Sequence, residues 1–316
     1  MLLITFILFL ISCLVLVVSG GYLVKLLIKI ASYLKLSEFV VAFIIMAFST
    51  SIPELFVGIS SALNKNPSLS LGNVIGSNIA DLTLIIGIAA LLGRGIKIKN
   101  PFIKKDSLAM FLVALAPIAL MMIGQSLSRI DGIILVSIFV IYMWHLARER
   151  KEIKGRFDEN NNKHIIVTFL LFALCLCVLF FSSHFVVKYA TQLAIELLLP
   201  SILIGLFLVA IGTSLPELVF ETRSVLAKKG DLAIGDAMGS VVCNSTLVLG
   251  ITSIIYPITN SFFIFLTSAI FMVIFTFLFM MFIRSKKGLS IKDAITLIIF
   301  YVLFIMFEFY FKSRIF

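Results

Sequence analysis

The chain has 316 residues, of which 61% are hydrophobic and only 13% are charged, and its mean hydropathy is +1.18. A soluble domain cannot bury that much apolar surface, so the composition excludes a water-soluble fold and indicates a membrane protein. The formal net charge of +10 does not indicate a nucleic-acid partner, because the basic residues lie in short loops between apolar segments.

Ten apolar segments are long enough to cross a bilayer with some tilt. In chain order they lie near residues 2–31, 39–63, 70–93, 106–124, 130–148, 164–194, 201–227, 233–256, 260–283 and 291–311. The first segment lacks a basic leading region and a small-residue cleavage site, so we interpret it as a retained span. We predict an all-α membrane protein of ten transmembrane helices. Its halves, 1–149 and 164–316, flank a hydrophilic cytoplasmic linker at 150–163.

An internal repeat relates these two halves. Residues 47–87 recur without a gap at residues 210–250, and 16 of the 41 aligned pairs are identical. Each half carries five spans, an odd number, so equivalent spans must cross the membrane in opposite directions. The sequence therefore predicts two inverted five-helix repeats related by a pseudo-twofold axis in the membrane plane, which is typical of secondary transporters.

Basic residues are concentrated on one side of this topology. The loops after the odd-numbered spans, with the adjoining span ends, hold 21 of the 26 Lys and Arg residues. Loops rich in Lys and Arg remain in the cytoplasm. We therefore expect a multi-pass protein of the cell membrane with both termini on the extracytoplasmic side.

Three of the 16 acidic residues fall well inside the spans, namely Glu54, Asp81 and Glu217. Asn244 occupies the position in the second repeat that is equivalent to Asp81. A carboxylate inside a membrane is costly and faces the protein interior or water, so we expect the three to converge at the centre of the bundle. A lone intramembrane Glu can be a structural hydrogen-bond partner, but the symmetry of the set favours a site.

Short hydroxyl side chains surround these positions in both repeats. They are Thr50, Ser51, Ser77, Thr213, Ser214 and Ser240. Pro53 and Pro216 each remove a backbone donor, so we expect the carbonyls near Ala47 and Ala210 to lose their helical partners and face the site. Hydroxyls in membrane helices can instead bond their own backbone. Oxygen donors of this kind select Ca²⁺, Na⁺, Mg²⁺ or Mn²⁺ over zinc or copper.

Three further polar residues are interpreted as having no role at the site. Asp236 and its counterpart Asn73 both suit helix starts. Glu221 lies near the cytoplasmic end of its span, and its counterpart is Gly58. For Glu221 we expect solvation or pairing with Arg223.

The paired motifs resemble the two alpha repeats of the cation/calcium exchanger superfamily, close to its prokaryotic sodium/calcium exchanger branch. They are FSTSIPEL at 48–55 with GNVIGSNIADL at 72–82, and IGTSLPEL at 211–218 with GDAMGSVVCNS at 235–245. The resemblance implies four cation sites in a diamond, with Glu54 and Glu217 binding Ca²⁺. It also implies that the Ca²⁺ and Na⁺ sites are completed by Ala47, Thr50, Ser51, Ser77, Ala210, Thr213, Ser214 and Ser240.

Two features depart from the pattern of that family. Ser49 stands where the motif usually has Gly. Asp81 and Asn244 would occupy the remaining corners of the diamond, but archaeal exchangers have Asn in the first repeat and Asp in the second. The total charge is unchanged by this reversal, so a cation antiporter is still expected, while the ion at each corner is left open.

These observations predict a secondary active antiporter, not an enzyme, that exchanges Ca²⁺ for Na⁺ by alternating access. The resemblance implies sliding of the first and sixth spans. We expect a monomeric transport unit in the lipid bilayer with Ca²⁺ and Na⁺ as transported ions and no cofactor. A proton-driven or K⁺-dependent Ca²⁺ antiporter is the alternative. A passive cation channel is more remote, and a membrane-embedded metalloenzyme ranks last because no nucleophile or phosphate-binding loop accompanies the carboxylates.

Overall fold

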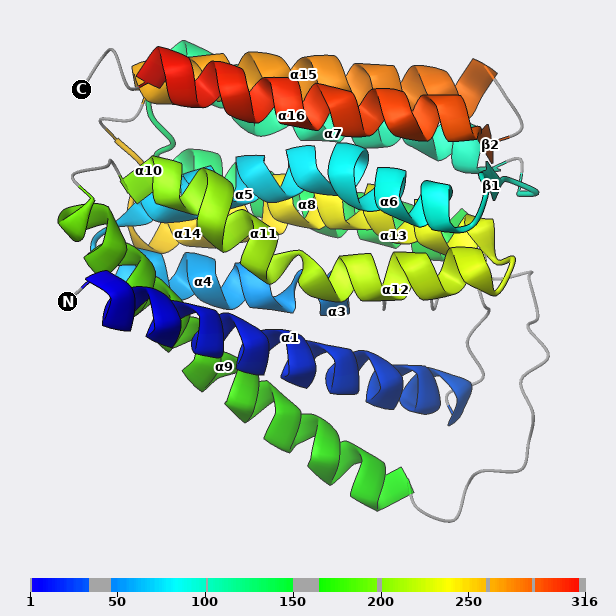
Figure 1. Cartoon of the computed structure of the whole chain (residues 1–316), viewed down its shortest axis with the longest axis horizontal. Helices are drawn as coiled ribbons and strands as arrows, with labels where there is room; N and C mark the ends of the chain where they lie inside the picture. The colour runs from blue at the N-terminus through cyan, green and yellow to red at the C-terminus, as the bar shows by residue number, and fades with distance from the viewer. Residues whose placement is uncertain are drawn as a thin grey trace.

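The computed structural model describes residues 2–33, 47–100, 102–149, 165–197, 201–259, 262–285 and 288–312. The first half comprises α1 (Leu2–Tyr33), α3 (Ala47–Thr50), α4 (Ile52–Leu63), α5 (Pro67–Ala80), the π-helical turn η2 (Asp81–Ile85), α6 (Ile86–Leu92), β1 (Ile96–Lys97), α7 (Phe102–Gly124) and α8 (Arg129–Glu149). The helices form a bundle of roughly parallel and antiparallel rods (Figure 1).

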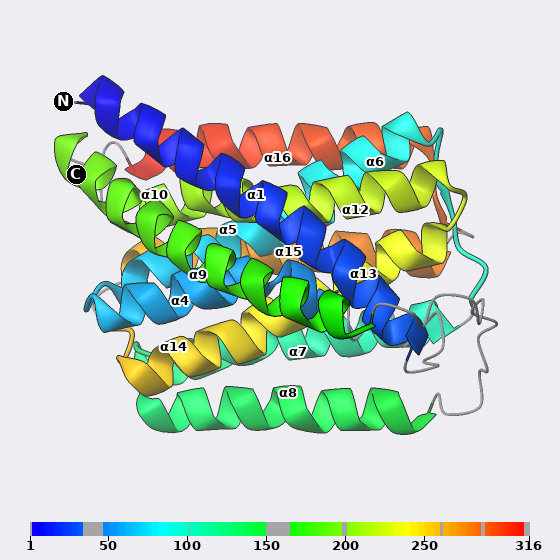
Figure 2. The same ribbon diagram turned by 90° about the horizontal axis from the view of Figure 1, so that it is seen from below.

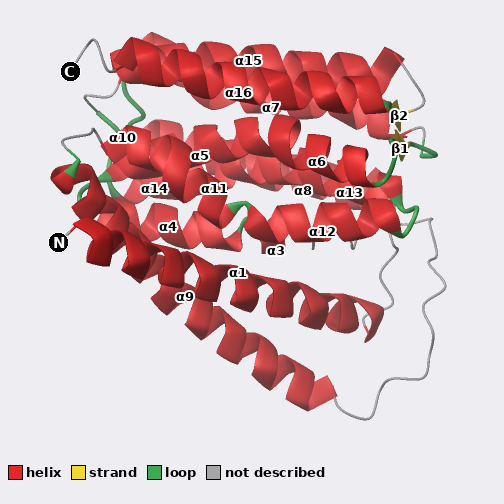
Figure 3. Ribbon diagram, viewed as in Figure 1, coloured by secondary structure: helices red, strands yellow, loops and turns green. Residues whose placement is uncertain are grey.

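The second half comprises α9 (Ile165–Glu196), α10 (Ser201–Ile204), η4 (Gly205–Val209), α11 (Ala210–Thr213), α12 (Leu215–Leu226), α13 (Gly230–Val242), η5 (Cys243–Val248), α14 (Leu249–Ile255), α15 (Phe262–Ser285), β2 (Gly288–Leu289) and α16 (Ile291–Lys312). Helices dominate the described chain, and its two short strands pair at one end of the bundle (Figure 3).

Six helices in the described residues are long and apolar enough to cross a membrane, and a seventh span is formed if Ile202–Thr213 and Leu215–Leu226 count together. Three further apolar helical stretches, Leu2–Leu16, Ile52–Leu63 and Ile165–Cys175, are shorter. The predicted multi-pass helical class is therefore confirmed. The second predicted span begins outside the described residues, and the structure describes it only from residue 47.

Two helices occupy the centre of the bundle. The stretches Pro67–Leu92 and Gly230–Ile255 each have 83% of their most apolar window buried inside the protein, against 17–44% for the other four spans. These two stretches are equivalent in the internal repeat. Most of the surface of these two helices is therefore covered by other parts of the protein.

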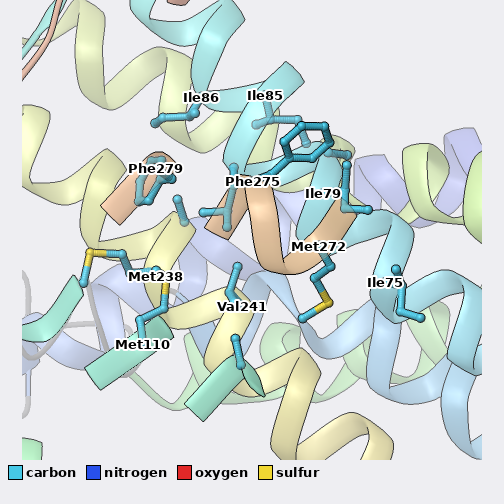
Figure 4. Packing of buried hydrophobic residues seen from close by; sticks show 14 of the residues in the cluster. Ile75, Ile79, Ile85, Ile86, Met110, Met238, Val241, Met272, Phe275 and Phe279 are labelled. Carbon is cyan, nitrogen blue, oxygen red and sulfur yellow. The ribbon is translucent and has the colours of Figure 1, made fainter. Parts of the chain in front are cut away.

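The apolar core packs around these central helices (Figure 4). Ile79 of α5, Val241 of α13, Met110 of α7 and Phe275 of α15 are all buried in one cluster. A second buried cluster joins Leu16 of α1, Val57 of α4 and Val186 of α9. Both clusters take side chains from both repeats, so neither half packs around a core of its own.

Glycine allows the close approach of α5 to the segment before the second helix break. A Cβ atom on Gly72 would lie 2.1 Å from the Ile202 carbonyl oxygen, and one on Gly76 would lie 2.1 Å from the Leu206 oxygen. No other residue type fits at such distances without moving a backbone. The two glycines thus set how near α5 comes to η4.

Two small β contacts join equivalent pairs of residues. β1 pairs with β2 so that Ile96 faces Leu289, and an isolated bridge joins Leu127 to Ile258. Subtracting 162 from 258 and from 289 gives 96 and 127. Equivalent residues therefore make equivalent contacts well beyond the two motifs, at an offset one residue shorter than in the motifs.

The starts of α8 and α16 show the same equivalence. The amide and hydroxyl of Ser128 donate to Asp131, at 2.8 and 2.7 Å, and those of Ser290 donate to Asp293, at 2.9 and 2.7 Å. Such reciprocal capping satisfies amide groups that a helix start leaves without partners.

Helices α1 and α9 pack side by side and cross the other helices obliquely (Figure 2). Near the ends of the pair, Glu196 accepts hydrogen bonds from the Thr5 hydroxyl, at 3.0 Å, and from the Gln192 amide, at 3.1 Å. The start of α1 and the end of α16 lie at the end of the bundle opposite to β1 and β2 (Figure 1).

Candidate cation site

Each repeat contains one broken helix, as the prolines predict. α3 ends at Thr50 and α4 begins at Ile52, and α11 ends at Thr213 and α12 begins at Leu215. The joining serines, Ser51 and Ser214, both have ψ near zero (0° and 8°), outside the regular helix. The second break bends the chain by 42°.

The expectation that the proline break frees the Ala210 carbonyl is wrong. This oxygen accepts a hydrogen bond from the Ser214 amide, at 3.0 Å, and another from the Thr213 hydroxyl, at 3.3 Å. The reason is geometric: Pro216 lacks the donor that would bond four residues earlier, at Gly212. As an ion ligand, Ala210 would have to use an oxygen that already accepts hydrogen bonds.

The central helices change their winding at the two positions that differ in charge. Asp81 begins the π-helical turn η2, and Asn244 is the second residue of the π-helical turn η5. Wide π turns within α-helices commonly accompany functional sites. Neither the oxygens of Asp81 nor the polar atoms of Asn244 have a hydrogen-bond partner, although both residues are fully buried.

Hydrogen bonds link the broken helix of each repeat to the central helix of the other. Thr50 contacts Asp236, at 3.4 Å, and Ser240, at 3.3 Å. In the second repeat, Thr213 contacts Asn73, at 3.1 Å, and Ser77, at 3.5 Å. Every partner in one set is the 163-residue equivalent of a partner in the other.

The three intramembrane carboxylates are fully buried and influence one another. Glu217 interacts electrostatically with Glu54 and Asp81, and Asp81 interacts with Glu54. The Ser77 hydroxyl donates to one oxygen of Glu54 at 3.3 Å. The other Glu54 oxygen and both Glu217 oxygens have no hydrogen-bond partner, which is costly for charged groups unless a cation or proton neutralises them.

The hydroxyls at the helix breaks are also available as oxygen ligands for a cation. Ser51 and Ser214 are fully buried, and neither hydroxyl makes a regular hydrogen bond. Ser214 lies near both Glu54 and Asp81. The side chain of Ala47 lies outside the described set, while its backbone begins α3.

The three carboxylates do not, however, lie close enough together to bind one ion jointly. No three Asp, Glu, His or Cys side chains in the described ranges stand close enough together to hold one metal ion. Any ion bound in this arrangement would therefore rely on one or two carboxylates together with amide, hydroxyl and carbonyl oxygens.

The predictions made from the sequence for three polar residues near the site are wrong. Asp236 and Asn73 are fully buried in the interiors of α13 and α5 and are not helix starts. Glu221 is fully buried, and neither of its oxygens has a hydrogen-bond or ion-pair partner, so it is not solvated or paired with Arg223. The spacing of Asp236 and Ser240, one helical turn apart, was a signal that could have linked Asp236 to the site.

Two broken helices beside two buried polar helices, with oxygen donors from both repeats at their contact, define a membrane cation transporter. The sequence profile of the sodium/calcium exchanger protein family matches residues 4–148 and 167–310. The chain therefore belongs to this family, whose members are membrane exchangers and not enzymes.

Individual relatives agree with this assignment. The chain is 27% identical to the sodium/calcium exchanger MaX1 of Methanosarcina acetivorans, covering 98% of this chain and 100% of that protein. It is 31% identical to the putative antiporter CaxA of Alkalimonas amylolytica, covering 72% and 74%. It is also 28% identical to the inner membrane protein YrbG of Escherichia coli, covering 69% and 70%.

The fold resembles that of a solved exchanger. A structure of the sodium-calcium exchanger NCX_Mj superimposes with a TM-score of 0.71, covering 97% of this chain and 99% of that chain at 24% identity. At this identity the likeness supports the fold alone.

Proposed function

We propose that this protein exchanges Ca²⁺ for Na⁺ across the cell membrane by alternating access. The observation that carries the proposal is the pair of equivalent hydrogen-bond sets at Thr50 and Thr213, which bring oxygen donors of both repeats to one buried centre. Sodium/calcium exchange is the activity named for its relative MaX1.

The proposed architecture is a ten-helix inverted repeat. Its support is that Ile96–Leu289 and Leu127–Ile258 are equivalent contacts at the two ends of α7, a helix of 23 residues. A contact that recurs at opposite ends of the bundle is expected when the repeats cross the membrane in opposite directions. With the basic loops in the cytoplasm, both termini would face outward.

In the proposed site the ions share one set of ligands. Glu54 and Glu217 would bind Ca²⁺ with hydroxyls and carbonyls of both breaks, and Asp81 and Asn244 would complete the Na⁺ positions. A vacant site would leave buried negative charge uncompensated, so the loaded protein reorients more easily than the empty one. Exchange then follows from differential binding without covalent chemistry.

Calcium uptake into proteoliposomes tests this function. Vesicles loaded with Na⁺ should accumulate radioactive calcium when external Na⁺ is absent, and a protonophore should leave the uptake unchanged. Vesicles loaded with K⁺ or choline should take up little. Uptake that requires a pH gradient and ignores Na⁺ would instead establish a proton-driven antiporter, and uptake without any counter-ion would establish a channel.

A further inference from the structure

Glu221 is a fully buried carboxylate that the proposed exchange site does not use. It lies on α12 one turn after Glu217, so both side chains project from the same face of the helix. Its exposure is 0%, and both of its oxygens are without hydrogen-bond partners. No Lys, Arg or His whose side chain is described is buried, so no buried basic group compensates this charge.

The internal repeat shows that the fold itself does not require a carboxylate here. The equivalent position is Gly58, where an added Cβ would lie 2.7 Å from the Thr252 hydroxyl oxygen and 3.1 Å from the Ser70 hydroxyl oxygen. These hydroxyls bond each other at 3.1 Å. The side chain of Val248 lies equally near, at 3.1 Å from the added Cβ, so these three side chains fill the space around Gly58 that Glu221 would need there.

The surroundings of Glu221 are correspondingly poor in oxygen donors. The equivalents of Thr252, Ser70 and Val248 are Ala89, Ala233 and Ile85. All three are buried and apolar. A carboxylate in such a slot is strongly destabilising unless a cation or proton neutralises it.

The neighbouring helix, α13, supplies further oxygen atoms through Asp236. α12 and α13 are antiparallel and joined by a short turn, with Glu221 five residues before the end of α12 and Asp236 six residues after the start of α13. Glu221 interacts electrostatically with Asp236. One Asp236 oxygen is bonded by Thr50 and the other has no hydrogen-bond partner.

We propose that Glu221 and Asp236 form a second cation subsite between α12 and α13, one helical turn from the exchange site toward the β1–β2 end, and that it binds Na⁺. A Ca²⁺ ion requires about 6–8 oxygens, more than the two carboxylates of this apolar slot supply, so Ca²⁺ is not expected to bind there. The identity of the ion rests on the proposed Na⁺ exchange.

Equilibrium binding of radioactive sodium to the purified protein, without Ca²⁺, tests this subsite. Glu221→Gln preserves side-chain size, and Asp236→Asn installs the amide that the fold already accommodates at Asn73. Each variant should bind about one Na⁺ fewer per chain than the unmodified protein at saturation. Glu308→Gln is the control, because Glu308 is equally buried but lies in α16 and is bonded by Ser268.

The subsite is wrong if both variants bind as many Na⁺ ions as the unmodified protein, or if Glu308→Gln loses the same number. Proton uptake by Glu221 in place of Na⁺ would also leave the sodium count unchanged and overturn it. Calcium uptake separates this result from a failure of the exchange function: Na⁺-driven uptake by the unmodified protein would still support exchange when the subsite is absent.

Discussion

Asp81 and Asn244 are equivalent residues that differ in charge. Both lie at the beginning of π-helical turns, both are fully buried, and neither side chain has a hydrogen-bond partner. A carboxylate on either side of the pseudo-symmetric centre would contribute the same total charge. Exchanging both residues at once should therefore preserve function, whereas replacing Asp81 alone should not.

Exchanging the two residues tests this equivalence. Asp81→Asn alone removes one negative charge from the site, and we expect Na⁺-driven calcium uptake to fall by about tenfold or more, which corresponds to about 1.4 kcal/mol. Adding Asn244→Asp should restore a substantial part of the uptake. A double variant as inactive as Asp81→Asn would show that the two positions are not equivalent.

At the scale of elements, the separation between α5 and η4 depends on glycine. Gly76 approaches the Leu206 carbonyl so closely that a methyl group would overlap the backbone. Since η4 leads directly into α11 and the second break, widening this contact would displace Thr213 from Ser77 and Asn73.

Gly76→Ala should lower the stability of the protein and its transport together. Overpacking of this kind costs about 1–3 kcal/mol, so the apparent unfolding temperature in detergent should fall. Gly21→Ala is the matched control, because no atom outside its own helix neighbourhood lies within 4 Å of an added Cβ and its stability should be unchanged or slightly higher. Equal unfolding temperatures for Gly76→Ala and the unmodified protein would contradict the close approach.

The helix breaks were predictable because proline acts locally. Pro53 and Pro216 each lack the amide donor that would continue the helical bonding, so α4 and α12 begin beside them as expected. The repeat itself was visible because identical residues recur at one offset. The predicted ligand set stays a prediction.

Other features depend on contacts that no local pattern encodes. The bonds of Thr50 to Asp236 and Ser240 join helices that are distant in sequence, and their pairing follows only from the packing of one repeat against the other. The burial of Glu221 was missed because Arg223 and nearby lysines indicated a solvated helix end. Its electrostatic interaction with Asp236 follows from the hairpin of α12 and α13.

At the scale of the whole molecule, the buried interior is rich in carboxyl groups. Glu54, Asp81, Glu217, Glu221 and Asp236 are all fully buried within the central helices and the broken helices. No basic side chain among those described is buried with them. The interior is therefore expected to hold cations or protons in every stable state, which would make net movement of an empty, unprotonated protein unfavourable and couple the two ions.

Competition between Ca²⁺ and Na⁺ for the purified protein tests this account most directly. Radioactive calcium should bind to the unmodified protein and be displaced by Na⁺ at constant ionic strength, while K⁺ or choline should displace little. Glu54→Gln and Glu217→Gln should each lower calcium affinity by about tenfold or more. Calcium binding that is insensitive to Na⁺, or that survives unchanged in both variants, would contradict a shared site formed by the two repeats.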